Sequence, residues 1–161
     1  QLAETAIFFH RIEILEALYV VFRITPHSRN IARSLLSQPK VYFFDNGMVV
    51  GDEGARFENL VAVSLLKHVF ARADYLGERV DLRYLRTKDG EEVDFCVVRD
   101  GEAELLIETK VSGPDPGSTL PRLHHRTGAP GIAVFRHLRR EQQAGGIALR
   151  RADRFLADLM M

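Results

Sequence analysis

The sequence predicts an α/β fold in which helices flank a single mixed β-sheet. Apolar residues recur at helical spacing in "GARFENLVAVSLLKHVF", residues 54–70, which indicates a long helix with one apolar face. Three segments of β-type sequence follow, and because tight turns join them they form antiparallel neighbours. These strands are expected at residues 80–86, 91–98 and 103–110. A loop rich in Pro and Gly and a short helix, 119–127, then lead to a strand at 131–136, which can therefore run parallel to the third strand.

A shorter N-terminal segment precedes this body. The elements expected in it are a helix at 4–18, strands at 19–25 and 40–44, and a short helix at 29–37. The second strand ends at the turn Asp45-Asn46-Gly47. This order suits the second half of a winged helix, and it suits equally a helix followed by a loose hairpin. We divide the chain accordingly into a helix-and-hairpin segment, 1–47, and a main domain, 48–161.

The C-terminal region completes the main domain. Residues 137–146 are polar and contain a Gly pair, so a loop is expected there. The segment "IALRR" predicts a short strand, and "ADRFLADLM" predicts a terminal helix.

Composition restricts the class of protein. An apolar content of 46% and a charged content of 27% are ordinary for a globular domain of 161 residues. The formal net charge is zero, so nucleic-acid binding would need a local basic patch. The single Cys96 excludes an internal disulfide and a cysteine-based zinc site, and a cytoplasmic setting is expected. No membrane span or signal peptide is expected, and an opening at Gln1 within a helical pattern predicts a piece of a longer protein.

Two further groups of residues are candidates for binding. Arg136, Arg139 and Arg140 in "RHLRREQQ" could meet phosphates, although a solvated face explains most such clusters. Three histidines are candidates for zinc: His124, His125 and His137. Their spacing is poor and no cysteine partner exists, so a surface helix is the better interpretation.

The chemistry of the sheet depends on how the second and third antiparallel strands pair. With a three-residue connection, 100–102, Asp94 lies opposite Glu108 and shares a face with Lys110. A two-residue Asp-Gly turn would instead send the two carboxylates to opposite faces. The first register is expected because it makes the better core around Phe95. The predicted core residues are Val61, Leu65, Val93, Phe95, Val97, Leu105, Ile107 and Val134.

Two opposed carboxylates repel each other, and this pair has two interpretations. Asp94 and Glu108 can be solvated or neutralised by Lys110, or they can hold a divalent cation, since Mg²⁺ prefers hard carboxylate oxygens and water. A lysine beside such a cation can stabilise a bound hydroxide or the charge developing on a phosphate. Glu58, at the edge of the apolar stripe of helix 54–70, adds a third carboxylate, although its place near the helix N-terminus also explains it.

Taken together these residues resemble the PD-(D/E)XK nuclease fold. Asp94, the sequence Glu108-Thr109-Lys110 and the helical Glu58 stand where that fold carries its acidic residues and its lysine. A closer resemblance covers nearly the whole chain, through "LEALYVVFRITPHSRNIARSLLSQPKVYFFDNG", "GARFENLVAVSLLK", "LRYLRTKDGEEVDFCV" and "LLIETKVS". These segments resemble the C-terminal domain of a family of prokaryotic AAA-type P-loop ATPases, domain of unknown function 4143. The motif positions include Lys40, Tyr42, Phe43, Asp45, Gly47, Gly54, Glu58, Arg86, Glu92, Asp94, Glu108 and Lys110, with Asn46 where Thr is usual.

The resemblance implies a restriction-endonuclease-like domain with catalytic residues Asp94, Glu108, Lys110 and Glu58. The three carboxylates would bind Mg²⁺, with Mn²⁺ as a substitute, for cleavage of DNA. It also implies an upstream ATPase module, while this chain has no Walker A motif and no ATP site is expected in it. The alternative is a non-catalytic module that binds DNA or protein and regulates the ATPase.

Overall fold

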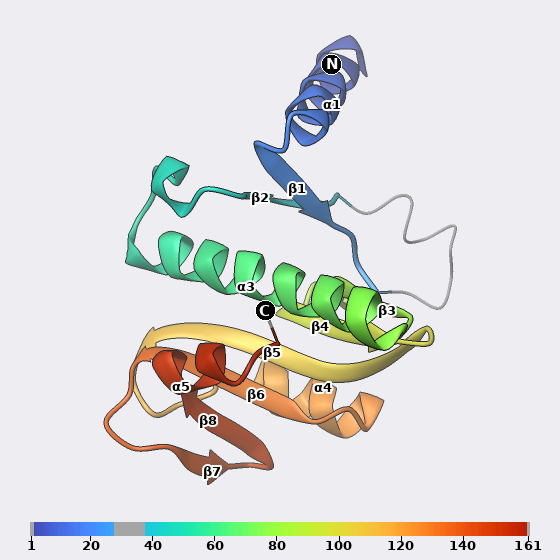
Figure 1. Ribbon diagram of the computed structural model, residues 1–161. Coiled ribbons are helices and arrows are strands. Elements are labelled where there is room, and N and C mark those ends of the chain that lie inside the picture. The colour runs from blue at the N-terminus through green and yellow to red at the C-terminus, as the bar shows by residue number, and fades with distance from the viewer. Residues whose placement is uncertain (1, 28–37, 161) are drawn as a thin grey trace.

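A computed structural model describes residues 2–27 and 38–160 of the chain. One six-stranded sheet has the strand order β3-β4-β5-β6-β8-β7, and β1 and β2 form a separate pair (Figure 1). The elements are α1 (Leu2–Ala17), β1 (Val21–Ile24), β2 (Lys40–Phe43), the 3-10 helix η1 (Asn46–Met48), α3 (Glu53–Leu76), β3 (Val80–Arg86), β4 (Glu92–Arg99), β5 (Glu102–Ser112), α4 (Thr119–Thr127), β6 (Gly131–His137), β7 (Gln142–Ala144), β8 (Ile147–Arg151) and α5 (Ala152–Ala157). The predicted class, a mixed sheet flanked by helices, is confirmed.

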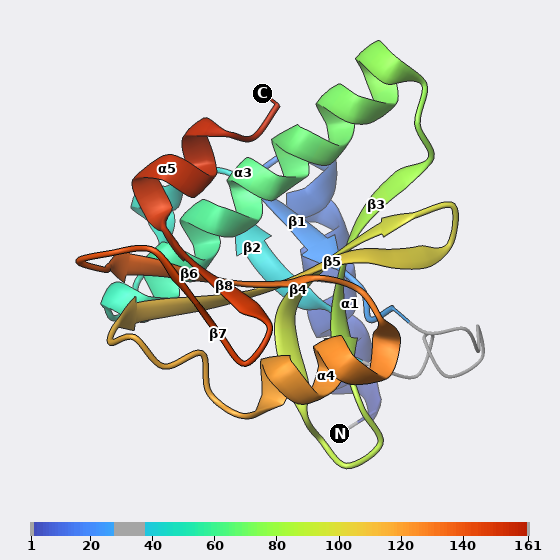
Figure 2. The same ribbon diagram turned by 90° about the horizontal axis from the view of Figure 1, so that it is seen from below.

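Helices cover both faces of the large sheet. α3 and α5 lie on one face and α4 lies on the other (Figure 2). The face under α3 holds one apolar cluster, which includes Val61 and Phe155. The face under α4 holds a second cluster, which includes Leu120 and Phe135. The sheet is therefore buried on both sides, as expected for parallel strands with helical crossovers.

The long helix α3 is defined by its two ends. The Asp52 side chain accepts a hydrogen bond from the Ala55 backbone N–H at 2.8 Å, and Gly77 ends the helix in the left-handed conformation. The helix continues beyond the predicted end at residue 70. Its last turns are held by Arg72, whose guanidinium lies 2.5 Å from the Glu104 carboxylate of β5. A tertiary ion pair thus extends the helix past its apolar pattern.

The turn between β4 and β5 differs from the prediction. Arg99 pairs with Glu102, so only Asp100 and Gly101 form the connection. Both turn residues have positive φ, 51° and 85°, as a two-residue hairpin turn that matches strand twist requires. The predicted three-residue connection is therefore wrong.

A β-bulge nevertheless restores the predicted register further along these strands. The shift lies between Val97 and Val98, and beyond it Phe95 pairs with Ile107. Extending this pairing by one residue places Asp94 opposite Glu108. The two positions are thus opposed in register. Alternation along β5 nevertheless puts Glu108 and Lys110 on the α4 side with Leu106, whereas the Asp94 carboxylate bonds to Thr109, which lies on the α3 side with Ile107. The predicted common face of Asp94 with Glu108 and Lys110 is therefore not observed.

A second bulge distorts β4 against β3. Its register shift falls at Tyr84, which opposes two residues, Asp94 and Phe95. Because of this shift, Val93 joins the cluster under α4 whereas Phe95 and Val97 join the cluster under α3. Strict alternation along a strand would put all three residues on one face, and the bulge moves Val93 to the other. Every predicted core residue is buried except Leu105, which is partly buried.

The crossover through α4 has the predicted outcome. β6 runs parallel to β5, and β8 runs parallel to β6. The strand β7 was missed, because it is a short edge strand of polar residues within the expected loop 137–146. Its exposed side chains have no apolar alternation by which it could be recognised.

The N-terminal helix and both strands of the hairpin are confirmed. The expected short helix at 29–37 lies outside the described residues. Phe22 and Tyr42 of the hairpin pack into the cluster under α3, and the Tyr84 backbone N–H donates to the Thr25 carbonyl. Apolar contacts thus cross the proposed boundary at residue 47, while the division itself and the winged-helix interpretation stay predictions. No helix in the described part of the chain is long and apolar enough to cross a membrane.

Candidate functional site

Asp94 lies in the bulge of β4 and its carboxylate bonds to the adjacent strand. Its Oδ2 accepts hydrogen bonds from the Thr109 backbone N–H at 2.9 Å and from the Thr109 hydroxyl at 2.8 Å. Its Oδ1 lies 3.5 Å from the Nζ of Lys40, the first residue of β2. The cation paired with Asp94 is therefore Lys40 and not Lys110, which the sequence had suggested.

The Lys40 ammonium contacts three carboxylates on the α3 side of the sheet. Its Nζ lies 2.8 Å from Glu92 Oε1 and 3.4 Å from Glu58 Oε1, in addition to its contact with Asp94. The Tyr42 hydroxyl donates to the same Glu58 oxygen at 2.7 Å. We refer to Lys40, Tyr42, Glu58, Glu92 and Asp94 as the Lys40 cluster.

Electrostatics in the Lys40 cluster favour the charged ammonium. Burial alone would lower the pKa of Lys40, but the negative charges of Asp94, Glu92 and Glu58 outweigh it and raise the pKa above 10.5. Burial, followed by the neighbouring Glu58, likewise raises the pKa of Tyr42, so its hydroxyl stays a hydrogen-bond donor. Arg86 adds a second cation at the edge of the cluster, with its Nε 3.9 Å from Glu92 Oε2, so two cations face three carboxylates.

Glu108 and Lys110 form a separate pair one strand away. Lys110 Nζ donates to Glu108 Oε1 at 3.0 Å. Glu108 Oε2 is buried and has no hydrogen-bond partner among the described residues. Burial raises the pKa of Glu108, the charge of Asp94 raises it further, and Lys110 offsets these effects only in part. A buried carboxylate oxygen without a partner is costly, and it is the type of group that a bound cation satisfies.

The predicted set of Asp94, Glu108, Lys110 and Glu58 is thus divided in two. Glu58 and Asp94 share Lys40, whereas Glu108 contacts Lys110. Within the described residues, no group of three or more His, Cys, Asp or Glu side chains is arranged to hold a metal. A cage of three carboxylates does not fit these positions. Mg²⁺ commonly takes one or two carboxylates and completes its shell with water and phosphate, so a smaller site would need only Asp94 and Glu108.

Sequence reasoning missed three members of the Lys40 cluster. Lys40, Tyr42 and Glu92 stand in the motifs that carry the family resemblance, yet they were not assigned to the site. Only the packing of the hairpin against α3 and β4 brings Lys40 to Asp94, which is distant in the sequence. The sequence did contain a signal for two of them. Lys40 and Tyr42 are two residues apart on one strand, so their side chains project from the same face.

Other reactive groups lie outside this site. Burial raises the pKa of the Cys96 thiol to about 12, so it stays protonated and unreactive at neutral pH. His124 Nδ1 bonds to the Ala129 carbonyl at 2.8 Å, and His137 Nε2 lies 2.9 Å from Glu53. These two histidines therefore serve local contacts, and no group of three metal-ligating side chains is found among the described residues.

Fold and site together define an α/β domain whose hairpin, helix and mixed sheet meet at an acidic cluster. The family model described as "Domain of unknown function (DUF4143)" matches residues 53–150, well over half of the chain, and the chain belongs to this family. A second model, "Domain of unknown function (DUF8612)", matches residues 6–54, which carry α1 and the hairpin. No curated protein and no solved structure matches the chain.

Proposed function

We propose that this chain is a nuclease-like domain of the PD-(D/E)XK type that cleaves phosphodiester bonds of DNA with Mg²⁺, or with Mn²⁺ as a substitute. The observation that carries the proposal is the buried Oε2 of Glu108, which has no hydrogen-bond partner in the described part of the chain, near Asp94 and two residues from Lys110. A buried carboxylate with a raised pKa and no hydrogen-bond donor does not stabilise the fold. Together with a second carboxylate it can bind a cation.

The residues have distinct proposed roles. Asp94 and Glu108 would hold the cation, and Thr109 orients the Asp94 carboxylate through two hydrogen bonds. When bound, the metal would polarise a phosphate oxygen and lower the pKa of a bound water. Lys110, which pairs with Glu108, would neutralise charge on a phosphate. Glu58 acts from outside this pair, through Lys40.

The wider context is also part of the proposal. The motifs resemble those of C-terminal domains that follow an AAA-type ATPase module, so we infer that an ATPase controls when this domain meets DNA. Contact between the ATPase module and this domain would then regulate DNA cleavage.

Calorimetry with Mn²⁺ and nicking of supercoiled plasmid test the proposal together. Wild type should show metal-dependent heat and nicking. Glu108→Gln and Asp94→Asn, which keep the side-chain shapes, should lose both while circular dichroism shows a folded domain. Asp89→Asn, in an exposed turn, removes the same charge elsewhere and serves as the matched control. The absence of both heat and nicking from the wild type at millimolar Mn²⁺ would overturn the proposal.

A second candidate is a non-catalytic interaction module that regulates the ATPase. The observation in its favour is that Lys40 already serves three carboxylates with its own ammonium, as a structural ion-pair network does. This function predicts no calorimetric heat with metal and no nicking by the wild type. The same experiment therefore separates the two candidates.

A further inference from the structure

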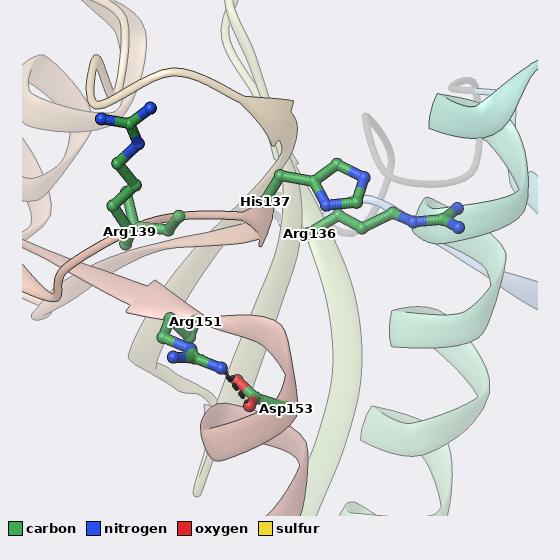
Figure 3. A pocket seen from close by; sticks show the side chains of 6 residues that line it. Arg136, His137, Arg139, Arg151 and Asp153 are labelled. Carbon is green, nitrogen blue, oxygen red and sulfur yellow. Dashed lines mark hydrogen bonds and ion pairs between the residues drawn. The ribbon is translucent and has the colours of Figure 1, made fainter.

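A basic pocket lies at the far end of the parallel strands from α4. Its volume is about 620 Å³, and its lining residues are Arg136, His137, Leu138, Arg139, Arg151 and Asp153. Figure 3 shows Arg136 and His137 projecting from the end of β6 toward α3, Arg139 on the following loop, and Arg151 paired with Asp153. We refer to it as the arginine pocket.

Strand register explains how the arginine pocket is assembled. Phe135 of β6 pairs with Lys110 of β5 on one side and with Arg151 of β8 on the other. The three strands are parallel, so their carboxyl ends, and the basic residues there, meet at one edge. That edge is where open α/β sheets commonly bind ligands.

Two of the arginines are held in place and one is unpaired. Arg136 Nε lies 3.0 Å from Glu53 Oε1, and Arg151 Nη2 lies 2.6 Å from Asp153 Oδ2. Arg139 makes no ion pair with any residue that the structure describes. Arg140 follows it, also exposed, in the same loop. The pocket lining therefore carries an excess of positive charge in a protein whose net charge is zero.

We propose that the arginine pocket binds backbone phosphates of a nucleic-acid strand. Guanidinium groups present planar pairs of N–H donors that match two phosphate oxygens, and their charge does not depend on pH near neutrality. Arg136 and Arg151, held by carboxylates, provide fixed walls, and the unpaired Arg139 is available to close on the phosphate. The choice of nucleic acid as the source of phosphate rests on the proposed nuclease function.

The position of the pocket suits a strand that also reaches Glu108 and Lys110. Lys110, Phe135 and Arg151 form one row across β5, β6 and β8. Adjacent strands are about 4.8 Å apart, so Arg151 lies about 10 Å from Lys110 along this row. A nucleic-acid backbone carries one charge per roughly 3.4 Å of each strand, so one continuous strand can place different phosphates at both positions.

Binding can be tested without metal or cleavage. Fluorescence anisotropy of short fluorescein-labelled DNA, single-stranded and duplex, is measured in EDTA with the whole chain. Arg139→Gln should weaken binding about tenfold, the effect of losing one charged hydrogen-bond pair. It should also make the dependence of log affinity on log salt shallower by about one. Arg139→Lys keeps the charge but not the planar pair of N–H donors, so it should bind DNA more tightly than Arg139→Gln and less tightly than the wild type.

The matched control is Arg126→Gln. Arg126 is exposed in the last turn of α4, and its helix leads into the opposite end of β6, so its loss should leave the affinity unchanged. Equal affinities of the Arg139→Gln and Arg126→Gln variants, or no DNA binding by the wild type, would refute the pocket. Equal competition by polyglutamate would also refute it, because the site would then recognise any polyanion. Loss of affinity in Arg139→Gln without any nicking by the wild type would retain the pocket and reject the nuclease activity.

Discussion

Replacing Lys40 by Met removes the ammonium that three carboxylates share while it keeps most of the aliphatic stem. In the wild type the Nζ lies 2.8, 3.4 and 3.5 Å from oxygens of Glu92, Glu58 and Asp94. Only 21% of the Lys40 side chain is exposed, so water can replace the lost contacts only in part. The variant would leave Glu58 and Asp94 without this cation, and Glu92 with only the more distant Arg86, at the junction of the hairpin and the sheet.

The expected loss of stability follows from this geometry. Removing one partner of a buried ion pair costs roughly 3–5 kcal/mol, because the other charge is left without compensation. The cluster is partly accessible to water, and Tyr42 still donates to Glu58, so we expect the lower end, about 3 kcal/mol. Urea denaturation followed by circular dichroism should show a lower midpoint with an unchanged slope.

The pH dependence provides an independent check. The pKa of Lys40 is raised in the folded state, so its stabilising effect is fully present below its ordinary pKa of 10.5. This effect is lost as the pH rises through the raised value, so wild type and Lys40→Met should converge in strongly alkaline buffer. Lys67→Met, on the exposed side of α3, is the matched control and should change stability by less than about 0.5 kcal/mol. A Lys40→Met variant as stable as this control at neutral pH would refute the reasoning.

Three further changes probe the core and the carboxylates. Phe95→Ala should lower the free energy of unfolding by about 3–5 kcal/mol in urea titrations, because the ring is fully buried, while the fully exposed Val50→Ala should have no effect. Glu108→Gln should raise stability by roughly 0.5–2 kcal/mol at pH 7. The raised pKa means that ionisation of Glu108 weakens the fold as pH rises, so this gain should vanish in melts below its ordinary pKa of 4.5. Asp94→Ala should lower stability by about 1–3 kcal/mol in thermal or urea melts, since the Thr109 donors lose their acceptor, whereas relief of carboxylate repulsion alone predicts no loss.

The periodicity of the sequence was sufficient to predict most of the elements. The alternation in β3 and the apolar stripe of α3 are local patterns. Both elements are found in the structure because residues close in the sequence define their buried faces. The parallel arrangement of β5 and β6 also followed from local information, because a helix between two strands leaves room for a crossover. Short polar edge strands such as β7 carry no such pattern and were missed.

The site depended more strongly on tertiary structure. Motifs identified Asp94, Glu108 and Lys110, and the register brought the first two opposite each other, but through a two-residue turn and a bulge that the spacing did not predict. The partners of the carboxylates were decided by packing alone. Lys40 reaches Asp94 because the hairpin packs against both α3 and β4, and a second bulge at Tyr84 shifts the faces of β4.

Local sequence thus determined which residues form helices and strands and which residue types are available for chemistry. It could not determine which cation faces which carboxylate, because that choice depends on contacts between segments more than fifty residues apart, such as Lys40 and Asp94. Bulges are similarly invisible to a period-two pattern, since one inserted residue reverses every face beyond it. The tertiary structure alone therefore separated Glu108 from the Lys40 cluster and left its Oε2 without a partner among residues 2–27 and 38–160.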